Sequence, residues 1–237
     1  PDLASELRLE RGVAQERLGT LFEINLSLYS EDKEIDLVAL LGKPLAVHVS
    51  TANDERWFHG VISHFSLAGF TERYGHYHAV LRPKLWLLGQ SACCKVFRSM
   101  TVADILQQVF QQGGVDTGAV ASSPSVEFEH CVQYRETDLH FVSRLMERYG
   151  YYYFHKHEDK KHVLEVATGI SGHADVGTFD HDSAGTADDE HHIGEWRVTT
   201  ALRSGSYRVS GTKNLTRQPI EAKEKSRRYT FYGIVGA

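Results

Sequence analysis

Long apolar runs, clustered positive charge and paired cysteines are all scarce in this sequence of 237 residues. No run of about 18 apolar residues is present, so we expect no membrane-spanning helix. The N-terminus begins Pro1, Asp2, Leu3 and soon becomes acidic, without the basic and apolar regions of a signal peptide, so we expect no export through a cleaved leader. The remaining composition, with 41% apolar residues, indicates a folded soluble protein with one large domain or two small ones.

Positive charge is too thinly spread to indicate a nucleic-acid groove. The formal net charge is -5, and only the segment 223–228 is locally basic. Since phosphate binding needs clustered Lys and Arg, we expect no nucleic acid among the partners.

Cysteines and catalytic motifs give equally little support to an enzyme. Of three cysteines, Cys93 and Cys94 are adjacent, which fits neither a disulfide framework nor a zinc knuckle and indicates reduced, buried thiols of a cytosolic protein. The segment GISG from Gly169 lacks the spacing of a G-x-S-x-G nucleophile elbow, and no phosphate-cradling Gly-rich loop or lone catalytic Cys is present. We therefore predict no catalytic residues, no cofactor and no enzymatic activity.

Strand patterns dominate residues 1–90. In LFEINLSLYS, apolar residues alternate with polar ones, as in a half-buried antiparallel strand: Phe22, Ile24, Leu26 and Leu28. The segment DLVALLGKPLAVHV predicts a helical turn at 36–41, ended by Gly42 and Pro44, and then a strand. The segments RWFHGVISHFSLAGF and GHYHAVLRPKLWLLG, separated by a polar turn at 71–75, predict a hairpin that could close the sheet into a barrel.

Two amphipathic helices interrupt the strands. The first begins with the capping-box spacing of Thr101 and Asp104 and ends at Gly113 and Gly114. Its apolar stripe repeats at i, i+3, i+4, i+7 and i+8: Val102, Ile105, Leu106, Val109 and Phe110.

The second helix is predicted to begin at Asp138, after the capping residue Thr137, and to stop at Gly150. Asp138 suits the positive N-terminal end of the helix dipole, and Arg144 and Arg148 suit the C-terminal end. Its apolar stripe, predicted to be core and not a cofactor site, is Leu139, Val142, Leu145, Met146 and Tyr149.

After the second helix, strands resume at 151–154 and in the segments HVLEVA, EWRVTT, GSYRVS and YTFYGIV. The acidic, Gly-rich stretch 169–190 separates them and predicts a mobile loop. The sequence as a whole therefore predicts a mainly β protein with added helices.

Histidines and acids gather at several places where a metal site is the alternative to scaffold. His76 and His78, and again His155 and His157, are two residues apart, which on a strand places both rings on one face. The segment HEDKKH from His157 has one residue too many for H-E-x-x-H and lies in a polar turn, where a helix is needed. The better metal candidates by ligand type are Asp180, His181, Asp182, Asp188, Asp189, His191 and His192. Since most such clusters are only solvated, no metal ligand is assigned, and a metal-dependent hydrolase is kept as the third hypothesis.

Five segments carry a resemblance to a known family: DLVALLGKPLAVHV, FHGVISHFSLAG, YHAVLRPKLWLLGQSACCKVFRSMTVADILQQVF, CVQYRETDLHFVSRLMERYGYYYF and WRVTTALRSGSYRVS. In order and with the expected gaps, they resemble the N-terminal region of VgrG, the spike protein of bacterial type VI secretion. The most specific matches are Leu81-Arg82-Pro83 with Leu85-Trp86-Leu87, and Tyr134-Arg135-Glu136-Thr137-Asp138 running into Phe141-Val142. The resemblance extends over nearly the whole chain.

The resemblance implies a tube adaptor similar to the hub of contractile phage tails, with two small antiparallel β-barrels joined by a helical segment. The implied domains are a first barrel at 1–90, a helical connector at 91–150 and a second barrel at 151–237. The family's oligosaccharide-binding-like domain and β-needle are expected to be absent from this fragment. The helix from Asp138 is then a buttress whose apolar stripe packs on the barrels.

The same resemblance implies the partners. Three chains would form a homotrimer with six barrels, so that a threefold spike seats on the sixfold Hcp tube, with baseplate components and effectors as further partners. The target membrane would be reached only through the needle. The protein would assemble in the cytoplasm and be secreted through the type VI system without a signal peptide. The hub of a phage tail or related contractile injection machine is the alternative function.

Overall fold

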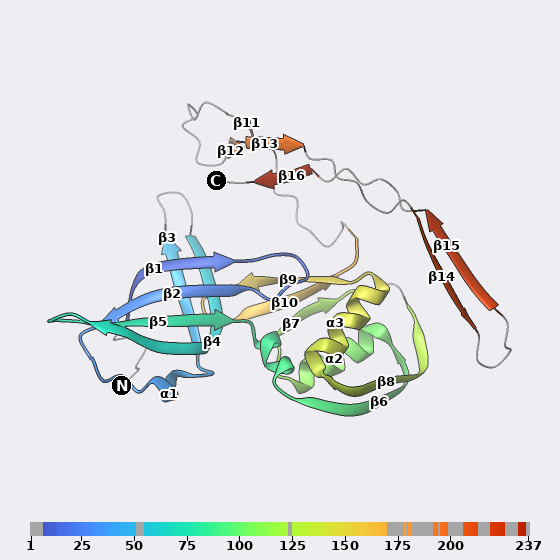
Figure 1. Ribbon diagram of the computed structural model, residues 1–237, viewed down its shortest axis with the longest axis horizontal. Helices are drawn as coiled ribbons and strands as arrows, with labels where there is room; N and C mark the ends of the chain where they lie inside the picture. Colours follow the sequence, from blue (N-terminus) through green and yellow to red (C-terminus); the bar gives the residue numbers. More distant parts are fainter. Residues whose placement is uncertain are drawn as a thin grey trace. The chain divides into compact units, whose positions relative to one another are not determined.

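The computed structural model describes residues 7–50, 55–122 and 125–169, together with residue 178 and short strands between 180 and 235. The chain divides into two units, Pro1–His173 and Ala174–Ala237. Strands predominate, and every helix of the described residues lies in the first unit (Figure 1). Among these residues no helix is long and apolar enough to cross a membrane. The predicted class, mainly β with helices, is therefore confirmed.

A curled five-stranded antiparallel sheet forms the N-terminal part of the first unit. Its strands are β1 (Arg8–Gln15), β2 (Glu23–Ser30), β3 (Pro44–Ser50), β4 (Glu55–Phe70) and β5 (Gly75–Arg82). The strand order is β1-β2-β5-β4-β3, which makes β1 and β3 the edges (Figure 1). The sheet is thus a half-barrel in which, over the described ranges, β1 and β3 do not pair. Its closure into the first of two barrels stays a prediction.

The inner face of this sheet is apolar because successive side chains of a strand point to opposite faces. Along β2, Ile24, Leu26 and Leu28 are buried, whereas the residues between them are partly exposed, which confirms the predicted alternation. The short helix α1 (Leu37–Leu40) adds Leu40 to the same core. The predicted helical turn and the hairpin of β4 and β5 are both present.

Within that hairpin, β4 and β5 approach each other closely at Gly60. A Cβ atom on Gly60 would lie 2.9 Å from the Cβ of Leu81 and 3.1 Å from the carbonyl oxygen of Arg82. β4 also has two register shifts against β5, and such bulges increase the local twist and bend the strand. Both features help the sheet to curl.

A two-stranded ribbon and two helices follow the sheet. The elements are the 3-10 helix η2 (Lys84–Gly89), β6 (Ala92–Thr101), α2 (Val102–Gln112), β8 (Glu127–Thr137) and α3 (Asp138–Tyr149). The two helices are those that the sequence predicts. Thr101 and Asp104 form a reciprocal capping box, and the Thr137 hydroxyl accepts a hydrogen bond from the first turn of α3. α3 ends at Gly150, whose φ of 74° is a left-handed conformation that glycine adopts without strain.

A second core lies between these helices and the ribbon. α2 buries its predicted stripe completely. α3 buries Val142, Leu145 and Met146 as predicted, while Leu139 and Tyr149 are only partly buried. Phe141, which the predicted stripe leaves out, is fully buried and stacks on Phe97 of β6 with ring centroids 5.3 Å apart. The helix therefore faces the ribbon more directly than its sequence pattern indicates.

A three-stranded sheet completes the described part of the first unit. It contains β7 (Thr117–Val120), β9 (Tyr152–His157) and β10 (His162–Ala167) in the order β7-β10-β9. β10 is antiparallel to β9 and parallel to β7. The predicted strands after Gly150 are confirmed, whereas β7 is not anticipated by the sequence pattern.

The second unit is described only through short strands, which pair two by two. They are β11 (Asp180–His181) with β12 (His192–Ile193), β13 (Glu195–Val198) with β16 (Tyr232–Val235), and β14 (Ser206–Thr212) with β15 (Pro219–Lys225). Most of the loop predicted at 169–190 lies outside the described residues. The predicted domain boundaries after residues 90 and 150, and the second barrel at 151–237, stay predictions.

Candidate functional site

The sequence's metal candidates are not brought together in the described part of the chain. There, no group of three or more His, Cys, Asp or Glu residues is arranged to hold a metal ion. Of the acidic-loop candidates, Asp182, Asp188, Asp189 and His191 lie outside the described residues. The backbones of Asp180, His181 and His192 belong to the pair β11 and β12, and nothing is described of their side chains.

The two predicted histidine pairs lie on strands, as expected. His76 and His78 lie on β5, on the face opposite the buried Tyr77, Ala79 and Leu81. His155 and His157 lie on β9, and both rings contact Phe22, with centroids 5.0 and 4.8 Å from its ring. The near miss to H-E-x-x-H spans the turn between β9 and β10, so it forms no helical metal motif.

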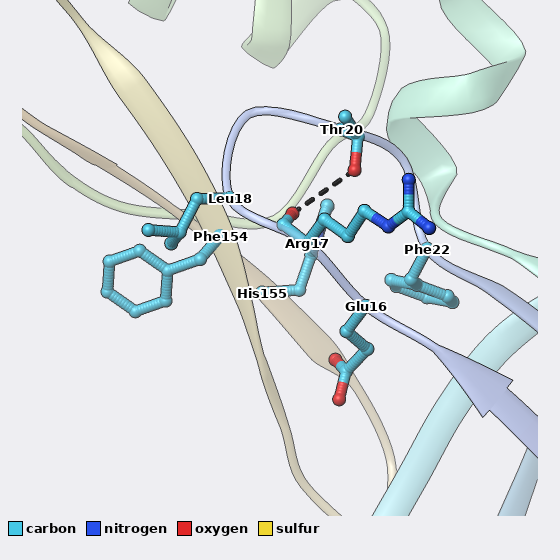
Figure 2. Close-up of a pocket in the computed structure, with 7 residues that line it drawn as sticks. All are labelled: Glu16, Arg17, Leu18, Thr20, Phe22, Phe154 and His155. Carbon is cyan, nitrogen blue, oxygen red and sulfur yellow. Dashed lines mark hydrogen bonds between the residues drawn. The ribbon is translucent and has the colours of Figure 1, made fainter. Parts of the chain in front are cut away.

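A pocket of about 250 Å³ opens next to His155, where the loop after β1 passes β9 (Figure 2). Its lining residues are Glu16, Arg17, Leu18, Thr20, Phe22, Phe154 and His155. Glu16 is the carboxylate of this lining, and it is already paired with Arg56 at 2.6 Å and with His157 at 2.9 Å. The pocket therefore offers no free pair of acid and base for catalysis.

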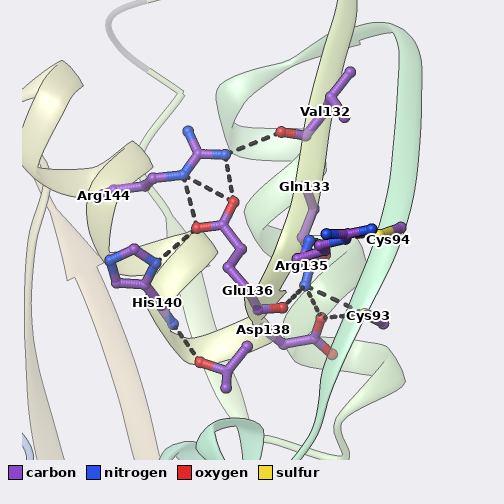
Figure 3. Close-up of polar contacts among 10 residues, drawn as sticks. Cys93, Cys94, Val132, Gln133, Arg135, Glu136, Asp138, His140 and Arg144 are labelled. Carbon is purple, nitrogen blue, oxygen red and sulfur yellow. Dashed lines mark hydrogen bonds and ion pairs between the residues drawn. The ribbon is translucent and has the colours of Figure 1, made fainter.

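The junction of β8 and α3 is held by an ion pair. Arg144 donates to Glu136 Oε1 at 2.6 Å and, through the same Nη2, to the carbonyl of Val132 at 3.0 Å (Figure 3). His140 Nδ1 lies 2.7 Å from the other carboxylate oxygen. Hydrogen bonds from Arg144, opposed by burial and helped by His140, lower the pKa of Glu136. The helix is thus fixed to the strand that precedes it.

A second polar contact fixes the ribbon to the start of α3. Asp138 accepts a hydrogen bond from Gln133 Nε2 at 2.7 Å, and Cys93 Sγ lies 3.4 Å away (Figure 3). Lys95 Nζ also donates to Asp138, at 3.0 Å. Burial raises the pKa of Asp138, but these hydrogen bonds outweigh it, so the pKa lies below its usual value. Burial also raises the pKa of the Cys93 thiol, which therefore stays protonated. This cysteine has a structural role in the network.

The outer face of the ribbon, in contrast, carries exposed apolar side chains that the other described residues leave uncovered, next to the exposed Arg98 and His130. Val96 and Val132 face each other across β6 and β8 and are 55% and 48% exposed, and Tyr134 is 65% exposed. Cys94 is exposed on the same face. We call Cys94, Val96, Val132 and Tyr134 the apolar row. The opposite face carries buried residues such as Phe97, so the ribbon has apolar side chains on both sides, and the described residues cover only one of them.

Backbone strain lies next to the apolar row. Ser99 and Arg135 have φ values of 48° and 50°, a region that costs free energy for residues other than glycine. The guanidinium of Arg135 lies over the ring of Tyr134, 5.2 Å from its centroid. Tyr and Arg are the residues most enriched at protein interfaces, and exposed apolar clusters mark contact sites. The apolar row is therefore the candidate interaction surface, which the sequence analysis did not identify.

Comparison with known proteins gives this surface a context. The sequence profile of the family described as "Phage tail baseplate hub (GPD)" matches residues 15–226. The chain is 33% identical over 244 residues to the type VI secretion system spike protein VgrG1c of Pseudomonas aeruginosa, a match that covers 97% of this chain and 34% of that protein. The chain thus spans about a third of the length of this relative.

Two solved structures share the fold. One is an E. coli component of the type VI secretion system with structural similarity to T4 bacteriophage tail proteins gp27 and gp5. It matches with a TM-score of 0.61 and 24% identity over 72% of this chain and 51% of that one. The other is a tail protein from Neisseria meningitidis, with a TM-score of 0.60 and 11% identity over 96% of this chain and 68% of that one.

Proposed function

Because the chain belongs to the phage tail baseplate hub family, we propose that it is the structural base of a type VI secretion spike and not an enzyme. The observation that carries this proposal is the family match over residues 15–226, together with the relationship to a VgrG spike protein along 97% of the chain. The absence of a metal-ligand group from the described residues is compatible with a structural role. On this proposal, the chain assembles in the cytoplasm and leaves the cell through the type VI system.

We further propose that the base is a homotrimer and that the apolar row lies at the contact between its chains. The side chains of Val96, Val132 and Tyr134 are large, apolar and exposed, and covering them on assembly would remove apolar surface from water. A closed ring of three chains also gives a threefold object that can seat on a sixfold Hcp tube. Effectors and baseplate components are the further partners that such a base would carry.

Light scattering over a dilution series tests the assembly. We expect trimer at high concentration and monomer at low concentration, because a contact made by a few exposed side chains on each chain should be reversible. Val132→Glu should shift this equilibrium toward the monomer, since it places a carboxylate in the contact. Val38→Glu is the matched control, because Val38 is 76% exposed on α1, away from the ribbon, and the change should leave the trimer intact. A dimer at every concentration would contradict the proposal, because a twofold object cannot seat symmetrically beneath a threefold spike.

Binding to the tube needs a separate measurement. Purified Hcp rings should sediment together with the trimeric chain and not with the Val132→Glu monomer. If the chain trimerises but never sediments with Hcp rings, the result would support a hub protein and contradict a role in type VI secretion.

The hub of a phage tail is the second candidate function. It is favoured by the likeness in fold to the Neisseria tail protein over 96% of this chain. The neighbouring genes distinguish the two settings, because tube, sheath and ATPase genes accompany type VI secretion, whereas capsid and tail genes accompany a phage.

A further inference from the structure

Four histidine rings meet where the five-stranded sheet contacts β9 and β10. His59 comes from β4, His155 and His157 come from β9, and His162 comes from β10. Three of them surround the ring of Phe22, which directly precedes β2, with the His155, His157 and His162 centroids 5.0, 4.8 and 5.5 Å away. His59 and His162 are only 3% and 2% exposed. We call these four residues the histidine cluster.

The hydrogen bonds fix the protonation of two of these rings. The Lys84 N–H donates to Nε2 of His162 at 2.9 Å, so that nitrogen has no proton and the Nδ1 of a neutral His162 carries it. This Nδ1–H then donates to Nδ1 of His59, 2.9 Å away, so His59 carries its proton on Nε2. A second proton on His162 would point at the Lys84 N–H, and one on His59 Nδ1 would point at the His162 N–H. Both rings must therefore be neutral.

The other two rings differ in how well they tolerate a charge. His157 Nδ1 lies 3.0 Å from the His59 backbone nitrogen and 3.1 Å from its carbonyl oxygen, and its Nε2 lies 2.9 Å from the carboxylate of Glu16. A protonated His157 would keep that carboxylate as partner. His155 Nε2, in contrast, is buried and has no hydrogen-bond partner among the described residues. A proton on that nitrogen would be left without an acceptor.

The charged groups around the cluster do not compensate for a buried charge. Glu16 follows β1 and pairs with Arg56 on β4. The other charged groups are Lys84 on η2, Asp116 before β7 and Asp159 in the turn between β9 and β10. Lys84 is itself paired with Asp116 at 2.7 Å. Burial is the main cause that lowers the pKa of His155 to about 4 and that of His162 to about 3, and it also lowers the pKa of His59.

We propose that the histidine cluster is an acid-sensitive latch, which holds the five-stranded sheet against β9 and β10 only while His59, His155 and His162 are neutral. In the unfolded chain a histidine takes up its proton near pH 6.5. The stabilisation by the neutral cluster is therefore complete above about pH 6.5 and is lost as the pH falls from there toward the values in the folded chain. For His155 and His162 together, the folding equilibrium should fall by about a hundredfold per pH unit in this window, since each contributes about tenfold.

The latch has a local structural consequence. The Lys84 amide donates to Nε2 of His162, so it loses its acceptor when that ring is protonated or turns away. The cores of α2 and α3 do not contain this bond. Acid should therefore open the contact between the two sheets before it unfolds the helical part.

Urea unfolding of the 237-residue chain between pH 7.5 and 5.0 tests the latch, because carboxylates remain ionised over that range. The test variant combines His155→Phe, which keeps a ring, with His162→Gln, whose amide can still accept from Lys84 and donate to His59. We expect it to lose most of the pH dependence in this range. His130→Gln, at an exposed position on β8, is the control and should retain it. Equal pH dependence in the wild type and the double variant would overturn the proposal.

Two measurements on the wild type test the latch if the double variant does not fold. NMR titration should find His155 and His162 still neutral at pH 5, and titration of both near pH 6.5 would refute the proposal. Hydrogen exchange, corrected for the intrinsic rate, should show lower protection of the Lys84 amide at pH 5.5 than at 7.5, and at pH 5.5 the Lys84 amide should be less protected than the Ile105 amide of α2. Equal protection of the two amides at pH 5.5 would mean that both exchange only by global unfolding, and it would refute a local opening of the latch.

Discussion

Replacement of Leu145 by Asp tests whether α3 is the buttress between the ribbon and the rest of the first unit. Leu145 is 2% exposed and lies in the core that α3 shares with α2 and the ribbon. Removing such a side chain costs about 2–5 kcal/mol, and a buried carboxylate without a partner adds several more. Since a domain has only about 5–15 kcal/mol of net stability, Leu145→Asp should leave little or no folded protein at 25 °C.

Urea unfolding followed by circular dichroism measures this effect. Leu145→Ala is the milder variant and should lower the free energy of unfolding by about 3 kcal/mol without preventing folding. Leu41→Asp is the matched control, because Leu41 is 46% exposed after α1, and it should change the free energy of unfolding by less than about 0.5 kcal/mol. An unfolding midpoint of Leu145→Asp equal to that of the wild type would refute the packing of α3 described above.

Three further changes test other parts of the chain. Gly60→Val should lower the free energy of unfolding by about 1–3 kcal/mol, because its Cβ would lie 2.9 Å from the Cβ of Leu81. An unchanged midpoint in urea unfolding would contradict the close approach of β4 and β5. Glu136→Gln should remove the stability gained from its lowered pKa, a contribution present above about pH 4.5 and lost below it, so wild type and variant should converge in acid. Deleting residues 183–189 should leave the unfolding midpoint nearly unchanged, since closure entropy depends weakly on loop length. If the deletion removed a metal found by elemental analysis of the purified protein, the hydrolase hypothesis would gain over the structural one.

Local sequence patterns predict the structure correctly where it depends on the residues of a single helix or strand. The capping box of Thr101 and Asp104 and the five-residue stripe of α2 need only the period of a helix, and both are present as predicted. The strand β2 shows its predicted alternation for the same reason. The helical pattern alone does not include Phe141 in the α3 stripe. Its contact with Phe97 on β6 is what shows which face of the helix the ribbon covers.

Features that depend on distant segments could not be predicted in this way. The four residues of β7 are an unremarkable segment in the sequence and form a strand by pairing in parallel with β10, more than 40 residues later. The pair His155 and His157 was correctly placed on one face of a strand. His162 joins that face because β10 pairs with β9 in a register that places it opposite His157, and His59 joins because the five-stranded sheet packs there. Register is likewise invisible in the sequence, so Val96 and Val132 could not be recognised as neighbours.

The ribbon can leave its apolar row exposed because the contacts of its inner side with the helices are sufficient for folding. A two-stranded ribbon is marginally stable by itself, and this one is held to α3 by the Asp138 hydrogen bonds and by the pair of Glu136 and Arg144. The outer side chains Val96 and Val132 contribute little to that core, so folding alone gives no reason for them to be apolar. Substitutions in the row should therefore change assembly without changing the free energy of unfolding of the monomer, whereas substitutions at the inner residue Phe97 should change both.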